Sequence, residues 1–312
     1  MHKKLYISTI VVLVLVLFNV FFIFKTVNHE NRTNISTEAI LNTNDTQAFI
    51  LPVSEASYIP VLNTNIVSPD IKAKAAVIYD VNSSRYLYSK DIEEKLPIAS
   101  LTKILTAIII VDKLNFKDII TVPKEAIKVD GERQDLYLGE RLSVEDLVKM
   151  MLIKSSNDAA YALAYYAKTI GVDLIFEMNT KAFGLGMSSS YFKDVAGLND
   201  EAYSNVEDMV KLVKNSLNYP VLWGIMSQKS VDLRSLDGIP HHLETTNQLL
   251  EEMPGIIGGK TGYTDDAKGC MILVVQVSPE GDRIISIVLG SGERFIDTNK
   301  LVVWANKAYR WY

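Results

Sequence analysis

The chain has 312 residues, of which 48% are hydrophobic and 22% charged, and its formal net charge is −5. Such a length can bury one sizeable core or two small ones, and an acidic balance without a basic tract argues against nucleic acid as a partner. The single cysteine, Cys270, lies in an apolar run, so the sequence excludes an intrachain disulfide and a cysteine-rich metal site.

The first predicted element is a membrane anchor. Residues 5–24 contain no charged side chain, and a helix of this length, at about 1.5 Å per residue, spans the roughly 30 Å of a bilayer core. No small-residue cleavage site follows Phe24, which favours an uncleaved signal anchor over a cleaved signal peptide. We therefore expect residues 1–24 to form a cytoplasmic tip and one transmembrane helix.

The next segment, residues 25–69, has the composition of a flexible tether. It is rich in Asn, Thr and Ser, and its few apolar residues follow no sustained period. As a coil it extends about 40 Å on average, which is enough to hold a folded domain away from a membrane surface. We expect that domain to occupy residues 70–312.

The folded domain is predicted to begin with strands and to continue with helices. Ala75–Tyr79 and Arg85–Tyr88 flank the turn-forming residues 80–84, a pattern typical of a β-hairpin. Ser143 and Ser204 each have the position and spacing of a helix cap. The helices are expected at residues 100–111, 143–154, 157–168, 172–183 and 205–217.

The end of the chain returns to strands. Strands are predicted at residues 258–263, 270–277 and 283–289, and a last helix at residues 296–311. Strands at both ends with helices between them predict an α+β domain whose terminal strands share one antiparallel sheet.

Catalytic chemistry is first suggested by Ser100 and Lys103. On a helix, residues three apart share one face, so the hydroxyl and the amine can lie within hydrogen-bonding distance. A serine hydroxyl becomes a good nucleophile when a neighbouring base takes its proton. Taken alone, S-x-x-K has an ordinary alternative, with Ser100 as a helix cap and Lys103 as a surface lysine.

Two further polar clusters interrupt apolar segments. Ser155-Ser156-Asn157 lies between two predicted helices, where a turn with a capping side chain is the structural alternative. Gly258–Gly262 places Lys260 in a glycine-rich strand, and glycines there admit the close approach of a ligand or another backbone. An edge strand with a solvated lysine is the alternative for this cluster.

The three clusters occur in the order found in β-lactamases and penicillin-binding proteins, with S-x-N in place of S-D-N. The likeness continues in the surrounding segments 139–147, 153–159 and 246–250. Over about residues 70–312 the chain resembles the serine D-alanyl-D-alanine carboxypeptidases, the low-molecular-mass penicillin-binding proteins. The resemblance implies a β-lactamase/transpeptidase-like fold. We expect the amino-terminal span to replace the carboxy-terminal anchor that many members of this family carry.

The resemblance also implies how the serine and its base act. Ser100 attacks the carbonyl between two terminal D-alanines, and water then resolves the acyl-enzyme. Lys103 must be neutral to act as the base, which means lowering its pKa from about 10.4 toward 7, at a cost of about 4 to 5 kcal/mol. Burial and the second cation, Lys260, act in that direction. Ser155 relays a proton to the leaving amine.

The remaining motif residues are expected to hold the substrate. Asn157 positions the substrate amide or the Lys103 amine, and Lys260 with Thr261 binds the free carboxylate of a peptide terminus. The backbone N–H groups of Ser100 and Tyr263 form the oxyanion hole by family likeness. The predicted catalytic residues are thus Ser100, Lys103 and Ser155, the predicted substrate-binding residues are Asn157, Lys260, Thr261, Gly262 and Tyr263, and Arg294 is interpreted as a surface arginine.

The implied substrate is a peptidoglycan stem peptide ending in D-Ala-D-Ala, with β-lactams as covalent inhibitors. Neither a metal nor a cofactor is expected, since His241 and His242 are adjacent and lack the spacing of a metal site. The function places the catalytic domain on the extracytoplasmic side of the cell membrane, held there by the single-pass anchor.

Two alternatives remain. A β-lactamase shares the motifs but uses a carboxylate to activate the deacylating water, and the nearest analogue of its E-x-x-L-N segment, residues 195–199, has Val195 in place of the glutamate. A non-catalytic penicillin-binding sensor is the second alternative. It needs a cytoplasmic domain to receive a signal, whereas only a few residues precede the predicted span.

Overall fold

The computed structural model describes residues 59–128 and 135–311. The predicted transmembrane segment and residues 25–58 of the predicted tether lie outside the described residues. Within the described part of the chain, no helix is long and apolar enough to cross a membrane.

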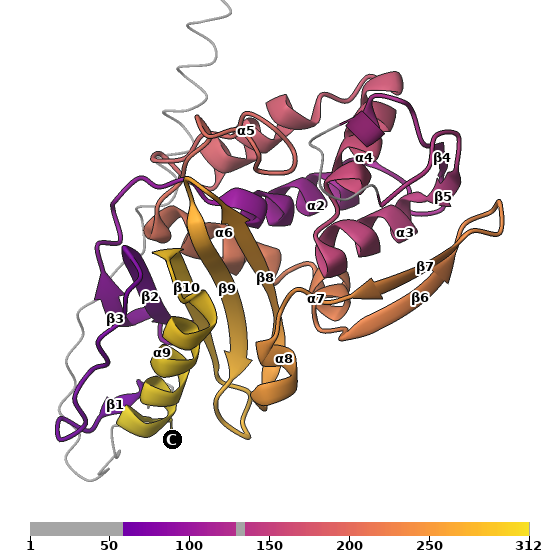
Figure 1. Ribbon diagram of the computed structural model, residues 1–312. Coiled ribbons are helices and arrows are strands. Elements are labelled where there is room, and N and C mark those ends of the chain that lie inside the picture. The colour runs from indigo at the N-terminus through magenta and orange to yellow at the C-terminus, as the bar shows by residue number, and fades with distance from the viewer. Residues whose placement is uncertain (1–58, 129–134, 312) are drawn as a thin grey trace, which may run out of the picture. The chain divides into compact units, whose positions relative to one another are not determined.

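The centre of the fold is a five-stranded antiparallel sheet with strand order β3-β2-β10-β9-β8 (Figure 1). It confirms the prediction that strands from both ends of the domain share one sheet. β10, from the end of the chain, pairs with β2, from its beginning, so that Val77 lies opposite Ile287. The strands are β2 (Ala75–Asp80), β3 (Arg85–Lys90), β8 (Ile256–Thr264), β9 (Lys268–Gln276) and β10 (Arg283–Ser291).

Helices fill the sequence between the first hairpin and the last three strands. The most deeply buried is α2 (Thr102–Lys113), in which every residue from Thr102 to Ile110 is buried. Burial on all sides explains why its sequence is apolar without a polar stripe. The other helical elements are the 3₁₀ turns η1 (Ala99–Leu101) and η2 (Ala126–Lys128), the π-helical turn η3 (Met150–Lys154), and the helices α3 (Val144–Lys149), α4 (Asn157–Thr169), α5 (Leu174–Gly184), α6 (Val206–Ser216), α7 (Pro220–Met226), α8 (Leu249–Glu252) and α9 (Arg294–Ala308).

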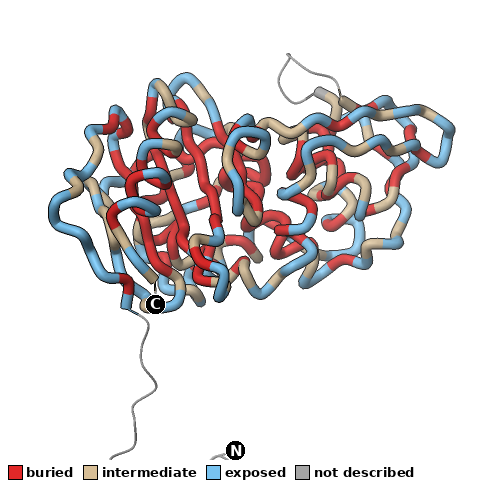
Figure 2. Tube along the Cα trace, turned by 90° about the horizontal axis from the view of Figure 1, so that it is seen from below, coloured by how far each residue is buried: buried red, intermediate tan, exposed pale blue. Residues whose placement is uncertain are grey.

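The sheet separates two hydrophobic cores, because side chains alternate between its faces. Val77 and Tyr79 of β2 face the larger core, which continues among the helices α2 to α7, and Ala76 and Ile78 face the smaller core beneath α9. Figure 2 shows the buried residues running through the sheet and on into the helices. The first turn of α2 is therefore fixed at the junction of sheet and helices.

Three short antiparallel pairs complete the described fold. The hairpin β6–β7 has no counterpart among the predicted elements, although Asp237-Gly238 at its turn is a hairpin signal in the sequence. The pairs are β1 (Val61–Leu62) with β11 (Tyr309–Arg310), β4 (Ile119–Thr121) with β5 (Arg141–Ser143), and β6 (Ser230–Arg234) with β7 (Pro240–Glu244).

The structure corrects three boundaries. The pairing of β1 with β11 makes Val61–Leu62 part of the folded domain, so the predicted start at residue 70 is too late. The same pairing ends α9 at Ala308, before the predicted end at residue 311. The cap of α6 is Asn205, whose side chain accepts from the backbone of Asp208, and not Ser204. The predicted cap Ser143 is confirmed.

Candidate active site

Ser100 lies in the 3₁₀ turn that leads into α2. It is half-buried, and it makes no capping hydrogen bond to the helix that follows. The preceding residue, Ala99, has a left-handed φ of 47°. Non-glycine residues seldom adopt this conformation unless their surroundings enforce it. The hydroxyl is therefore presented by a constrained backbone, and it accepts a hydrogen bond from the Lys103 amine at 2.7 Å.

Lys103 is fully buried, so the interpretation of a surface lysine is wrong. Besides Ser100, its amine donates to Oδ1 of Asn157 at 2.8 Å and to the backbone carbonyl of Ala196 at 2.9 Å. Burial lowers the pKa of Lys103 to about 7, and the nearby Asp194 carboxylate opposes that shift. At neutral pH a large share of this amine is uncharged.

The second cluster adjoins Lys103 because the chain turns sharply between η3 and α4. Ser155 ends η3 in a left-handed conformation, with φ 65°. Ser156 is the N-cap of α4 and accepts from the backbone of Ala159, as the structural alternative for this motif proposed. Ser155 and Asn157 are thereby left free to face the third cluster and Lys103.

The third cluster lies on the edge strand β8. Lys260 is almost fully buried, and its amine donates to the Ser155 hydroxyl at 2.7 Å and to the Thr261 carbonyl at 2.9 Å. Burial, followed by the charges of Lys103 and Arg294, holds the pKa of Lys260 well below its ordinary value. The interpretation of a solvated edge-strand lysine is therefore wrong.

Glycine allows β8 to approach the serine. A β-carbon added at Gly262 would lie 3.0 Å from the Ser100 backbone nitrogen. Side chains rarely tolerate such a contact, so the absence of one here lets the strand pack directly on η1. Tyr263, the next residue, has an exposed side chain, which lies near enough to Arg294 to act on its pKa.

Comparisons with known proteins agree with this geometry. A family model described as D-alanyl-D-alanine carboxypeptidase matches residues 63–293. The chain belongs to this family. It is 31% identical to the D-alanyl-D-alanine carboxypeptidase DacF of Bacillus subtilis over 76% of this chain and 63% of that protein. It is 26% identical to a D-alanyl-D-alanine endopeptidase of Pseudomonas aeruginosa over 77% of this chain and 83% of that protein.

A solved structure supports the fold of this carboxypeptidase-family domain. The Streptomyces K15 DD-transpeptidase superposes with a TM-score of 0.70 at 25% identity, covering 77% of this chain and 98% of that one. The α+β, penicillin-binding fold predicted from the sequence is thus confirmed. The chain spans less than two thirds of the length of DacF, the Bacillus relative.

Arg294, interpreted from the sequence as a surface residue, is partly buried at the start of α9. Its stem packs over Gly269 of β9, where an added β-carbon would lie 3.0 Å from the arginine's own. Its Nε is buried and has no hydrogen-bond partner among the described residues. Burial lowers the pKa of Arg294, and its charge in turn acts on Lys260. A guanidinium group with a free Nε and a charge that acts on Lys260 is suited to an anionic ligand.

The turn formed by residues 194–199 is the part of the site that the motifs did not reveal. Ala196 contributes only a carbonyl oxygen, which no sequence pattern marks. Gly197, with φ 81°, packs so tightly that an added β-carbon would lie 1.9 Å from the Ala99 carbonyl oxygen. This turn therefore contacts both the residue before the serine and the buried lysine.

Replacing Gly197 with alanine is expected to destabilise the fold by about 3 to 5 kcal/mol, because backbone overlap adds to the left-handed strain. Urea denaturation measures the loss. Gly171→Ala is the matched control: Gly171 has a similar φ of 82° but open space around it, so only about 1 to 2 kcal/mol should be lost. Equal losses in the two variants would show that the contact with Ala99 is unimportant.

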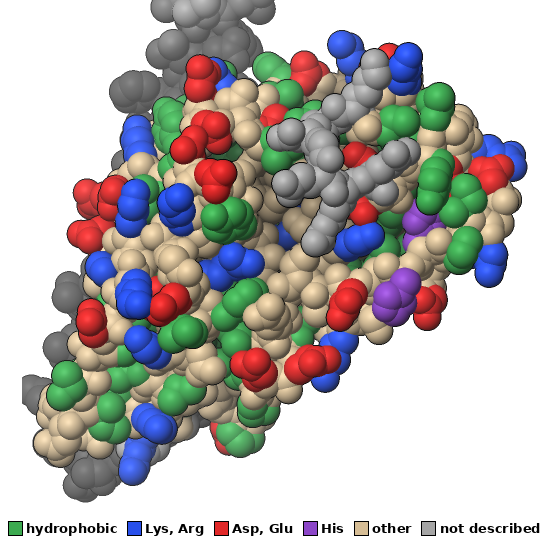
Figure 3. Space-filling model, viewed as in Figure 1, with side chains coloured by type: hydrophobic (Ala, Val, Ile, Leu, Met, Phe, Trp, Pro, Cys, Tyr) green, Lys and Arg blue, Asp and Glu red, His purple; other side chains and the backbone are tan. Residues whose placement is uncertain are grey.

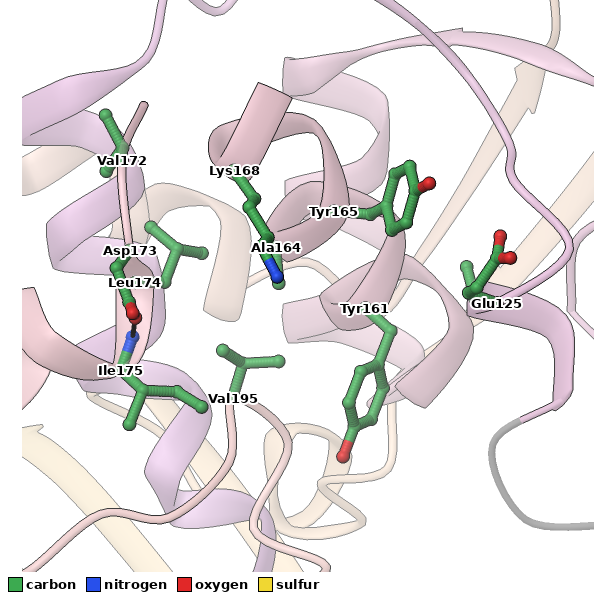
Figure 4. Close-up of a pocket in the computed structure, with 11 residues that line it drawn as sticks. Glu125, Tyr161, Ala164, Tyr165, Lys168, Val172, Asp173, Leu174, Ile175 and Val195 are labelled. Carbon is green, nitrogen blue, oxygen red and sulfur yellow. Dashed lines mark hydrogen bonds between the residues drawn. The ribbon is translucent and has the colours of Figure 1, made fainter. Parts of the chain in front are cut away.

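An apolar pocket lies behind this turn, away from Ser100. It has a volume of about 290 Å³ and is enclosed by η2, α4 and the start of α5, with Val195 at its floor (Figure 4). On the face shown in Figure 3, positive and negative side chains are mixed, without a large area of one sign.

Proposed function

We propose that this protein is a serine D-alanyl-D-alanine carboxypeptidase, which removes the terminal D-alanine from peptidoglycan stem peptides through an acyl-enzyme on Ser100. One observation carries the proposal: the buried amine of Lys103, with a pKa of about 7, lies 2.7 Å from the Ser100 hydroxyl. The family membership and the names of the relatives point to the same chemistry.

The partners of Lys103 favour proton transfer from Ser100. A neutral lysine amine has two N–H groups and one lone pair. The Ala196 carbonyl and the Asn157 amide oxygen can only accept, so they bind the two N–H groups. The lone pair is then left for the Ser100 hydroxyl, which alone among the three described partners has a proton to give. When the amine is neutral, the hydrogen bond between the two therefore runs from the hydroxyl to the amine. The amine can take this proton as Ser100 attacks the substrate carbonyl.

The Ser155–Lys260 pair serves the leaving group. The 2.7 Å hydrogen bond from the Lys260 amine holds the Ser155 hydroxyl in place. A hydroxyl can donate and accept at once, so Ser155 can pass a proton to the amine of the departing D-alanine. The backbone N–H groups of Ser100 and Tyr263 are proposed as the oxyanion hole, on the family resemblance.

The carboxylate of the substrate is proposed to bind at the Lys260 end of the site. The charge of Arg294 acts on Lys260 there, and the hydroxyl of the next residue, Thr261, is held by a 2.6 Å contact with that of Thr246. An arriving anion favours the protonated form of Lys260 and offsets the repulsion among the cations. A free carboxyl terminus is then the feature that distinguishes substrates.

A peptide whose last D-alanine is amidated is expected to be cleaved about a hundredfold less efficiently than the free acid, because it loses the charged interaction. Release of the terminal residue, measured as kcat/KM, gives the ratio. Arg294→Gln should lower kcat/KM for the free acid and narrow the ratio, whereas Arg283→Gln, on an exposed residue of β10, should leave both unchanged. Equal cleavage of the two peptides would exclude this carboxylate site.

Mass spectrometry of the products from a stem pentapeptide tests the function itself. Loss of one D-alanine supports the carboxypeptidase, whereas cross-linked or internally cut products would support the activities named for the Streptomyces and Pseudomonas relatives.

A β-lactamase is disfavoured because none of the described carboxylates hydrogen-bonds to Ser100 or Lys103, and Val195 stands where that class has its glutamate. Rapid turnover of penicillin would favour the β-lactamase over the carboxypeptidase. A non-catalytic sensor would release no D-alanine.

The cell membrane is the proposed location, with the catalytic domain on the extracytoplasmic side. The support is the uncharged stretch Leu5–Phe24 and the position of peptidoglycan outside the membrane. Residues 1–24 would be the anchor and residues 25–58 the tether. Carbonate extraction of membranes is expected to leave the whole chain in the pellet and to release a chain that lacks residues 1–24.

A further inference from the structure

The turn after α5 is organised around one buried carboxylate. Asp194, which is 8% exposed, accepts hydrogen bonds from the backbone of four residues of its own turn. Its Oδ1 accepts from Ala196 at 2.7 Å, from Gly197 at 2.5 Å and from Leu198 at 3.2 Å, and its Oδ2 accepts from Asn199 at 2.7 Å. Both oxygens are used, so an ionised carboxylate suits this position better than a group that must donate.

This turn is attached to α2 at successive points. The Val195 carbonyl accepts from the Thr106 hydroxyl at 2.8 Å, and the Ala196 carbonyl accepts from the Lys103 amine at 2.9 Å. Gly197 packs against Ala99, at the start of η1. A shift of the turn would therefore move an acceptor of the buried lysine and a contact of the backbone that presents the serine.

One side of the turn borders a cavity. Behind Val195 lies the apolar pocket between α4 and α5, in which Figure 4 shows the Val195, Tyr161 and Lys168 side chains directed toward a common space. The cavity removes part of the dispersion contact that a filled core would give on that side, although Val195 itself is buried. The four hydrogen bonds to Asp194 therefore add to the α2 contacts in fixing the shape of the turn.

The same carboxylate acts on the charge of the lysine. Asp194 raises the pKa of Lys103 against the larger lowering by burial. Two cations also belong to this cluster: Lys260 of β8, whose pKa the charge of Lys103 lowers, and Arg294 of α9, whose charge acts on Lys260. Tyr161, from α4, is kept neutral in the working range, since burial and Asp194 raise its pKa to about 12. Asp194 therefore supplies the negative charge near the Lys103 amine.

We propose that Asp194 is a positioning residue for the acylation step, which holds the Ala196 carbonyl against Lys103 and keeps that amine a strong enough base to deprotonate Ser100. The inference rests on the proposed function, because it assigns Asp194 to the same acylation reaction. If the pKa of Lys103 were too low, its amine would be neutral but too weak a base to take the Ser100 proton, because proton transfer to a weaker base is slower.

Asp194→Asn tests the charge while keeping the size of the side chain. The midpoint of the acid limb of penicillin acylation should move to lower pH, by about half to one unit, because the protonated lysine loses its favourable neighbour. The acylation rate on the plateau should fall about threefold to tenfold, as expected for a weaker base. Stopped-flow labelling from pH 5 to pH 9 gives both values.

Two variants separate charge from folding. Asp194→Glu keeps the charge and should return the midpoint to the wild-type value, even if its longer side chain reduces the rate. Asp208→Asn removes another buried carboxylate, which holds a loop through Ser189 and Ser190 and pairs with Lys211. Asp208 hydrogen-bonds to neither of the two active-site lysines, so the midpoint of this variant should not move. Any unfolding is followed by circular dichroism at each pH.

The outcomes distinguish this inference from the proposed function. If wild-type protein forms no adduct, the proposed function fails. If wild-type protein acylates and folded Asp194→Asn has an unchanged midpoint, the role of Asp194 fails and the proposed function stands. A midpoint that moves equally in Asp194→Asn and Asp208→Asn would also overturn the role, because the effect would then be one of net charge.

Discussion

Replacing Ser100 with alanine is expected to abolish both the covalent penicillin adduct and the release of D-alanine. No other described hydroxyl accepts from the Lys103 amine, so a water molecule is the only remaining nucleophile that this base could activate. Loss of a catalytic serine commonly reduces turnover by about a millionfold. Labelled penicillin on a denaturing gel, followed by peptide mapping, measures the adduct and its position.

The Ser100→Ala protein should remain folded. The side chain is half-buried and its hydroxyl has Lys103 as its described partner, so the unfolding free energy should change by less than about 1.5 kcal/mol. Ser227→Ala, at an exposed serine after α7, is the matched control and should acylate normally. An adduct on Ser100→Ala of wild-type intensity would show that the nucleophile is another residue.

The sequence revealed those parts of the site that depend on local geometry. Ser100 and Lys103 are three residues apart on a helical turn, so their contact could be predicted from spacing alone. Ser155 and Lys260 are 105 positions apart, and only the family resemblance brought them together before the structure did. The central strands of the sheet could also be predicted from local sequence, because the long apolar runs of β9 and β10 are typical of strands buried on both faces.

Other parts of the site depend on tertiary packing and leave little trace in the sequence. The Ala196 acceptor is a backbone oxygen, and any residue could supply it. In the sequence Arg294 looks like a surface arginine. In the structure its stem packs inward, because Gly269 has no side chain to block it. Lys260 was predicted in a strand, but its burial requires Ser155, which satisfies one of its hydrogens. Burial of a polar group follows from partners that are distant in the sequence.

The burial of two lysine amines in the site disfavours the folded state. Lys103 and Lys260 are both fully or almost fully buried, and burial is the main cause of the lowered pKa of each. Burying an amine that is charged in the unfolded chain costs free energy at neutral pH. A neutral, basic Lys103 therefore lowers the free energy of unfolding, as is common for catalytic groups with shifted pKa values. The size of this loss can be measured.

Replacing Lys103 with methionine is expected to reduce acylation by about a thousandfold or more, which is the scale of losing an activating base. Methionine fills the buried volume of the lysine stem without an amine. In the wild type, acylation should rise with pH through about 7 as Lys103 loses its proton, and the variant should lack this limb. Lys149→Met, on an ion-paired lysine of α3, is the control and should keep both the rate and the limb.

The stability of the same variant tests whether Lys103 is neutral in the folded protein. The folded pKa of about 7 lies below the ordinary value of about 10.4, so between these two values the unfolded chain binds more protons and wild-type stability rises with pH. Lys103→Met lacks this group. The other titrating groups are common to both proteins, and Lys260 is the one whose pKa the charge of Lys103 lowers, so the difference between the proteins reports mainly on Lys103. From pH 7 to pH 10 the wild type should therefore gain about 3 kcal/mol of unfolding free energy relative to the variant. Urea denaturation at the two pH values gives that difference, and a difference near zero would mean that Lys103 stays charged in the fold and cannot be the base.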